Sequence, residues 1–118
     1  MDSSISNAFA VFLDQAPQQA SAWMKAVGQM DAVSALDKKT AELGYLAVLA
    51  AAGLTSGIPF HVSRARQLGA SRQEIISAIL LGLPAVGLVV VQSLPAALEA
   101  YDSPASLSLG STAFPGCD

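Results

Sequence analysis

The sequence is short of charge. Of its 118 residues only 13% are charged, as 6 Lys+Arg and 9 Asp+Glu, whereas an average soluble domain has about 25%. Apolar residues make up 53% of the chain, which excludes intrinsic disorder as its main state. The net charge of -3 argues against a nucleic-acid partner, because binding phosphates needs a basic surface. A single domain of this kind has to hide apolar surface either in an oligomer or in a membrane.

Cysteine and histidine are nearly absent as well. The one cysteine, Cys117, excludes an intramolecular disulfide, a cysteine-based zinc site and a Cys-x-x-Cys redox centre. The one histidine, His61, cannot form a three-ligand zinc site, so we expect no metal, and we expect no cofactor. The N-terminus lacks the basic stretch of a signal peptide, which predicts a cytoplasmic protein.

Strand patterns are missing too, and alanine and leucine favour helix throughout. We expect six helices. The first is capped by Ser4, the second starts at Pro17, and the third runs from a cap at Asp37 to Gly53. The fourth runs from Pro59 to about Gly69, the fifth starts at a capping box at residues 71–74, and the sixth runs from Pro84 to Tyr101 with a kink at Pro95. The predicted fold class is all-α, a bundle of about six helices with a central helical hairpin. Residues 1–102 form this domain, and residues 103–118 form a tail that is loop or disordered.

Two long uncharged runs could each cross a membrane by length, since a transmembrane helix needs about 20 apolar residues. They cover residues 43–60 and 75–98. Gly53 and Pro59 break the first run, and prolines interrupt the second. We therefore predict that both are buried in a soluble homo-oligomer, with no membrane as a partner.

One stretch carries a family pattern. It contains LDKKTAEL at residues 36–43, then an alanine-rich helix that ends at Gly53, and then His61 followed by LGAS and RQEI at residues 68–75. This text resembles the carboxymuconolactone decarboxylase family, which includes the alkyl hydroperoxidase D branch. The resemblance implies that family's helical fold, and trimers or hexamers of the chain.

The peroxidase branch has a Glu, eleven residues, a Cys, two residues, a second Cys, three residues and a His. Placed here without gaps, the pattern puts its Glu on Glu42 and its His on His61, but its cysteines on Leu54 and Gly57. A thiol peroxidase needs one thiolate to attack the peroxide and a second thiol to resolve the sulfenic acid. Because leucine and glycine can do neither, we expect no thiol peroxidase activity.

Glu42 and His61 are the predicted catalytic residues. If they meet, within one subunit or across an interface, they form an acid/base pair that can move a proton next to a carbonyl without a cofactor. Tyr45, Ser56 and Arg64 are the predicted substrate-binding residues. Arg64 lies one turn after His61 and its planar guanidinium suits a substrate carboxylate.

Each of these residues also has a structural interpretation. The His and Glu could serve as a buried cap and a surface charge, Tyr45 as core, Ser56 as a helix cap and Arg64 as half of a surface ion pair. The predicted function is a thiol-independent acid/base enzyme, a lyase or isomerase acting on a small organic acid or lactone as its ligand. The alternative is a non-catalytic oligomeric binding or scaffold protein on the same fold. A closed polar pocket around His61 would favour the enzyme.

Overall fold

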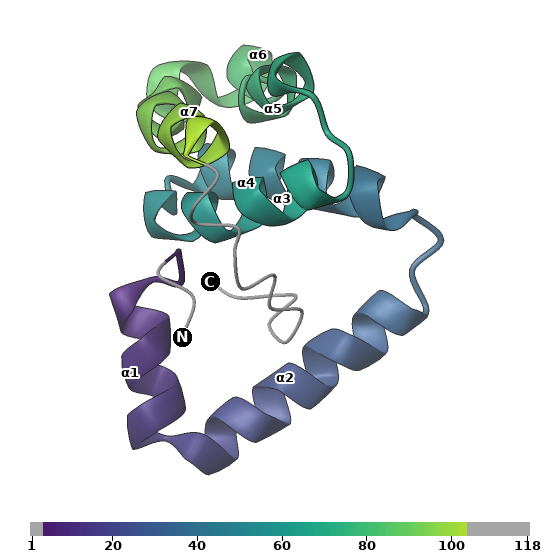
Figure 1. Cartoon of the computed structure of the whole chain (residues 1–118), viewed down its shortest axis with the longest axis vertical. Coiled ribbons are helices and arrows are strands. Elements are labelled where there is room, and N and C mark those ends of the chain that lie inside the picture. Colours follow the sequence, from purple (N-terminus) through teal and green to yellow (C-terminus); the bar gives the residue numbers. More distant parts are fainter. Residues whose placement is uncertain (1–3, 104–118) are drawn as a thin grey trace.

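The computed structural model describes residues 4–103, and all regular structure within that range is helical (Figure 1). The elements are α1 (Asn7–Gln15), α2 (Pro17–Ala32), α3 (Lys38–Ala52), the 3-10 helix η1 (Thr55–Gly57), α4 (Ile58–Gln67), α5 (Arg72–Ile79), α6 (Leu83–Val86), the 3-10 helix η2 (Gly87–Ser93) and α7 (Leu94–Asp102). The all-α class is confirmed. The predicted tail, with Cys117, lies outside the described residues except for its first residue.

Several helix ends follow the local signals of the sequence. The Asp37 side chain accepts a hydrogen bond from the backbone N–H of Thr40 at 2.8 Å and so caps α3. Gly53 ends α3 in the left-handed conformation, with φ of 73°, which glycine adopts without steric cost. At α5, Ser71 and Glu74 bond reciprocally to each other's backbone N–H at 3.0 and 2.9 Å, which completes the predicted capping box.

The first cap differs from the prediction. Helix α1 is capped by Ser6, whose hydroxyl accepts from the backbone N–H of Phe9 at 3.1 Å, and not by Ser4. Ser4 and Ser6 both precede the same apolar residues. The residue that caps the helix is the one directly before Asn7, and its backbone has to be extended. Ser6 has that extended backbone, with ψ of 149°.

The sixth predicted helix is divided into three segments. Helix α6 lasts only one turn, because Gly87 leaves the helical conformation with φ of 79° and ψ of -155°. The chain then continues as η2 to Ser93. Pro95 does not kink a continuous helix but lies in the first turn of α7, where its missing N–H costs no hydrogen bond.

Helices α3 to α7 form a compact unit, which we call the body (residues 38–102). The hairpin of α3 and α4 lies at its centre, and α5, η2 and α7 pack against it (Figure 1). Its core consists of fully or almost fully buried apolar side chains, among them Leu46, Leu49, Ile58, Val62, Ala65, Ile75, Ile79, Val90 and Ala97. This core holds the middle of α3 and the start of α4 in a fixed relation.

Helices α1 and α2 form a separate arm (residues 7–32) that projects from the body (Figure 1). A small cluster of Ile5, Phe9 and Phe60 joins the start of α1 to α4. Along the 16 residues of α2, only Ala20 is buried. The arm therefore contacts the body over a small area at its base, and α2 returns toward the start of α3.

The stretch Arg72–Asp102 is apolar enough by length and composition to cross a membrane, with a mean hydropathy of 2.4 over 18 residues. Only 22% of that window is buried. The structure divides the stretch into α5, α6, η2 and α7.

Candidate functional site

Glu42 and His61 meet within one chain. Glu42 lies in α3 and His61 in the first turns of α4, and their atoms Oε1 and Nδ1 are 2.8 Å apart. With the carboxylate ionised, Nδ1–H of His61 donates this hydrogen bond. Glu42 is 7% exposed and His61 is 0% exposed, so the contact is shielded from water, where a charge-assisted bond is strong.

Arg64 binds the other oxygen of the same carboxylate. Its Nε lies 3.5 Å from Oε2 of Glu42, and its side chain is mostly buried. His61 and Arg64 are one turn apart on α4, so a single helix presents both groups to Glu42. The expected ion pair of Arg64 therefore exists, but its partner is the candidate catalytic carboxylate. The Nη1 atom of Arg64 is buried and has no hydrogen-bond partner in residues 4–103.

Two aromatic rings enclose the imidazole. The Tyr45 ring lies 4.4 Å from the His61 ring, measured between centroids, at an angle of 49°. The Phe60 ring meets the His61 ring edge-on, with 5.1 Å between the centroids and an angle of 87° between the planes. These contacts fix the ring of His61 and hold its Nδ1 toward Glu42.

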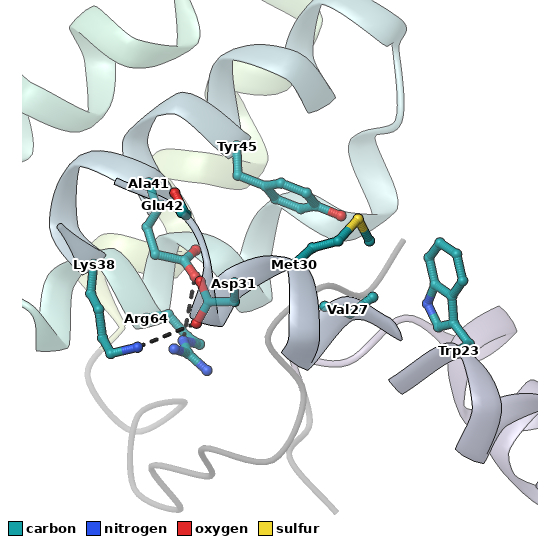
Figure 2. Close-up of a pocket in the computed structure, with 10 residues that line it drawn as sticks. Trp23, Val27, Met30, Asp31, Lys38, Ala41, Glu42, Tyr45 and Arg64 are labelled. Carbon is teal, nitrogen blue, oxygen red and sulfur yellow. Dashed lines mark hydrogen bonds and ion pairs between the residues drawn. The ribbon is translucent and has the colours of Figure 1, made fainter. Parts of the chain in front are cut away.

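A cavity of about 340 Å³ lies beside Glu42, between the arm and the body (Figure 2). It is lined by Trp23, Val27, Met30, Asp31, Ser34, Lys38, Ala41, Glu42, Tyr45 and Arg64. His61 is not part of this lining, so this cavity is not the closed polar pocket around His61 that would favour an enzyme. The order of groups is therefore cavity, then Glu42, then His61, and Glu42 is the member of the pair that a ligand would touch.

The two walls of the cavity differ in chemistry. The wall from α2 presents apolar side chains, those of Trp23, Val27 and Met30, while the wall from α3 and α4 presents Glu42 and Arg64 (Figure 2). Such a cleft suits a small molecule with one apolar part and one acidic or carbonyl part.

An ion pair lies at one end of the cavity. Nζ of Lys38 is 3.3 Å from Oδ2 of Asp31, and both side chains are substantially exposed. This contact joins the end of α2 to the start of α3 beside the cavity.

The residues of the α2 wall were not among the predicted site residues. Their signal is present in the sequence, since Trp23, Val27 and Met30 follow a spacing of four and three residues, which places them along one helix face. The pattern indicates that these residues lie on one face of the helix, but it does not reveal that Glu42 lies opposite that face.

Ser56 is the one predicted site residue that neither lines the cavity nor contacts Glu42 in the contacts described above. Its side chain is exposed, and it does not line this cavity. Neither Ser56 nor Thr55 caps α4 as expected, because η1 runs directly into α4 and the cap position, Gly57, is already helical. No extended residue precedes the helix to direct a side chain at its first N–H groups.

The peroxidase pattern would place its cysteines at Leu54 and Gly57. Leu54 directly precedes η1, and Gly57 is the last residue of η1. Leu54 is exposed, and Gly57 is buried. Within residues 4–103, no group of three or more His, Cys, Asp or Glu side chains could hold a metal ion.

Comparison with known proteins gives a family match. A model of the carboxymuconolactone decarboxylase family matches residues 17–100, from the start of α2 to the last turn of α7. The matched range includes both walls of the cavity. No curated protein and no solved structure matches the chain.

Proposed function

The chain belongs to the carboxymuconolactone decarboxylase family, and we propose that it is a thiol-independent acid/base enzyme of the decarboxylase or isomerase type. Its substrate class is a small organic acid or lactone. The observation that carries this proposal is the Glu42 carboxylate at the cavity wall, held by His61 at 2.8 Å on one oxygen and by Arg64 at 3.5 Å on the other.

Glu42 is the group that exchanges a proton with the substrate. In an isomerisation it takes a proton from a carbon next to a carbonyl, the electron pair of that C–H bond passes into an enolate, and the proton returns to another carbon. In a decarboxylation Glu42 first takes up a proton from water. The C–C bond to the substrate carboxylate then breaks, CO₂ leaves, and the electron pair that remains on carbon takes the proton from Glu42, which returns to its carboxylate form. Both reactions need only a positioned acid/base group.

His61 is a positioning residue in this scheme, because it reaches the cavity only through Glu42. Its hydrogen bond to Oε1 fixes the carboxylate and keeps the other oxygen directed toward Arg64 and the cavity. Tyr45 has two contacts in this scheme, because it lines the cavity and packs on the His61 ring.

Arg64 is the proposed contact for a substrate carboxylate. It lines the cavity, and a guanidinium has five N–H donors, of which Glu42 occupies only part. Trp23, Val27 and Met30 would then cover the apolar part of the substrate.

Deuterium exchange tests the acid/base role without knowledge of the natural substrate. A panel of small keto acids and carboxylated lactones is incubated with the protein in D₂O, and NMR follows exchange at the carbon next to the carbonyl. Glu42→Gln should lower the rate by about 10²–10⁴, the usual contribution of a general acid/base group. The control Glu99→Gln, at an exposed carboxylate of α7, should leave the rate unchanged. Equal rates for wild type and Glu42→Gln would refute the proposal, and binding without exchange would favour the scaffold alternative.

The role of Arg64 has its own test. Arg64→Gln should raise KM for carboxylated substrates more than for their methyl esters, whereas Arg66→Gln, two residues on in the same helix and outside the cavity lining, should not. An equal effect on acids and esters would show that Arg64 supports Glu42 only.

The absence of thiol chemistry is tested separately. We expect no hydroperoxide turnover with a dithiol reductant, in wild type or in Cys117→Ser, because Leu54 and Gly57 stand at the cysteine positions. Turnover in wild type that Cys117→Ser abolishes would assign a thiol role to Cys117.

A further inference from the structure

The orientation of the His61 ring depends on its neighbours. The last torsion of a histidine side chain, which turns the ring, has a broad energy profile, so the side chain itself restrains the ring only weakly. Besides its hydrogen bond to Glu42, the ring contacts Tyr45 and meets Phe60 edge-on. An edge-on contact is one of the arrangements that aromatic pairs prefer. The position of Phe60 therefore helps to set the direction of Nδ1.

Phe60 is also the residue of the body on which the base of the arm packs. It lies in α4 and is 2% exposed, and it shares a buried cluster with Ile5 and Phe9. The partly buried residues packed against this cluster are Phe12, Leu13 and Met24. All of these partners come from residues 5–24, that is, from the arm and the residues just before it. One ring thus contacts the arm and His61 at the same time.

The arm reaches Glu42 by two routes. On the first route, Trp23 of α2 lines the cavity on which Glu42 opens. On the second route, the next residue of α2, Met24, packs against the cluster around Phe60, and Phe60 contacts His61. The same helix therefore limits the space for a ligand and supports the ring behind Glu42.

We propose that Phe60 is a positioning residue, through which the docked arm holds the His61 ring in the orientation that keeps Nδ1 on Glu42. Phe9 is the arm residue that keeps the Phe60 ring in place. The effect on catalysis rests on the acid/base role proposed for Glu42, whereas the effect on the His61 ring does not. Docking of the arm and readiness of the acid/base group are then one event.

The proposed proton transfer needs such support. While Glu42 carries the proton it is neutral, and its hydrogen bond with His61 loses the assistance of the charge, which makes such a bond roughly half as strong. Packing then has to keep the ring in place until the proton leaves. A ring that turned away at this stage would leave Glu42 free to rotate out of line with the substrate, and small misplacements of reacting groups lower rates steeply.

NMR of the imidazole tests the positioning without any substrate. His61 is the only histidine of the chain, so its ring signals are unambiguous, and its buried, hydrogen-bonded Nδ1–H should exchange slowly with water. Phe60→Leu removes the ring edge but keeps an apolar side chain, and Phe9→Ala removes the arm partner but keeps Phe60. Each should speed exchange of the Nδ1 proton by about 3- to 10-fold, the shift in an opening equilibrium that loss of one aromatic pair produces.

Three further variants separate positioning from a general loss of stability. Ile79→Val removes a methylene from the core of the body, away from the Phe60 cluster, and should leave the Nδ1 proton as it is in wild type. Val11→Ala, at an exposed position of α1, should do the same. Phe9→Leu refills most of the space beside Phe60 and should return the exchange rate toward that of wild type. Circular dichroism checks that each variant remains helical.

Kinetics test the consequence for the reaction. With a compound that the wild type deuterates in D₂O, Phe60→Leu should lower kcat by about tenfold, within the loss of 10² that a misplacement of 1 Å can cause. KM should stay within about a factor of two, because Phe60 does not line the cavity and an interaction that acts only in the transition state changes kcat alone.

Two NMR results would overturn the positioning role. One is a Nδ1 proton that exchanges as in wild type in both Phe60→Leu and Phe9→Ala, and the other is an equal acceleration in Ile79→Val. If the Nδ1 proton responds as expected while kcat does not, the catalytic part of the proposal is wrong. A wild type that deuterates no compound would refute the acid/base role of Glu42, and the Nδ1 proton would still decide whether the arm positions His61.

Discussion

The arm and the body are built from helices of similar length but hold together in different ways. In the body, every helix of two turns or more has buried residues packed into one core, and α4 alone buries six of its ten residues. In the arm, α1 buries only Phe9 and α2 buries only Ala20. Most helical stability in proteins comes from packing of an apolar face, so the arm depends on few contacts.

The cavity lies where these two regions meet, and the contrast gives its walls different properties. The wall with Glu42, Tyr45 and Arg64 is fixed by the core of the body. The wall with Trp23 and Met30 stands on a helix that few contacts restrain. The proposed proton transfer therefore takes place at the wall that the core fixes. The wall with Trp23 and Met30 can adjust to the apolar part of different ligands.

The largest effect is expected from a cavity in the core of the body. Leu46→Ala removes a fully buried side chain and should lower the free energy of unfolding by about 2–5 kcal/mol. Met30→Ala, at a 60% exposed position of the arm, should change it by less than about 0.5 kcal/mol. Urea unfolding measured by circular dichroism compares the two, and similar losses would show that the arm is as tightly packed as the body.

The next effect is in the wall that the body contributes to the cavity. Glu42→Gln removes a charge that accepts from His61 and pairs with Arg64, and it should cost about 1–3 kcal/mol because both partners lose their counterpart in a buried setting. In ¹⁵N NMR the imidazole signal of Nδ1 should shift, because a neutral amide replaces the carboxylate that accepts its hydrogen bond. Glu99→Gln is the control. An unchanged imidazole spectrum in Glu42→Gln would contradict the contact.

A smaller, local effect is expected when the base of the arm is weakened. Phe9→Ala removes the main buried side chain that joins α1 to Phe60. Hydrogen exchange should accelerate in α1 and α2, while the slowest amides of α3 and α4 keep their protection, because local opening of the arm does not require unfolding of the body. Acceleration by the same factor in both regions would show that they unfold as one unit.

The smallest effect concerns the end of the body. The side chain of Arg72 donates hydrogen bonds to Asp102 at 3.1 Å, and this contact holds the pKa of Asp102 below its ordinary value. A lowered pKa in the folded state contributes stability at neutral pH that is lost as the pH falls through that pKa. The urea midpoint should therefore drop between pH 7 and pH 3, and Asp102→Asn should reduce this drop slightly. A drop that is the same in Asp102→Asn, or larger, would contradict the role of the pair.

The sequence predicted best what neighbouring residues decide. The caps at Asp37 and Ser71 and the stop at Gly53 need only local hydrogen bonds and local backbone freedom, and all three are present. The Glu42 and His61 pair was predicted from a family spacing, and the structure shows that the two residues meet within one chain.

What the sequence did not predict depends on contacts between distant segments or on competition between equivalent signals. Two serines compete to cap α1, and only the backbone at Ser6 decides between them. The stretch from Pro84 to Tyr101 has the composition of one helix, but the backbone of Gly87 leaves the helical conformation and ends α6 there. The position of α2 opposite Glu42, which makes the cavity, follows from the turn between the arm and the body and has no counterpart in local pattern.

Trp23 is the only tryptophan of the chain, and it stands in the cavity wall at 45% exposure. All indole fluorescence of the protein therefore originates at the cavity. A ligand that fills the space between α2 and Glu42 removes water from the indole and moves its emission toward the blue, and a ligand bound anywhere else leaves the spectrum where it was. The arm thus gives the unlabelled protein an optical reporter, with which a library of acids and lactones can be screened for occupancy before any reaction is known.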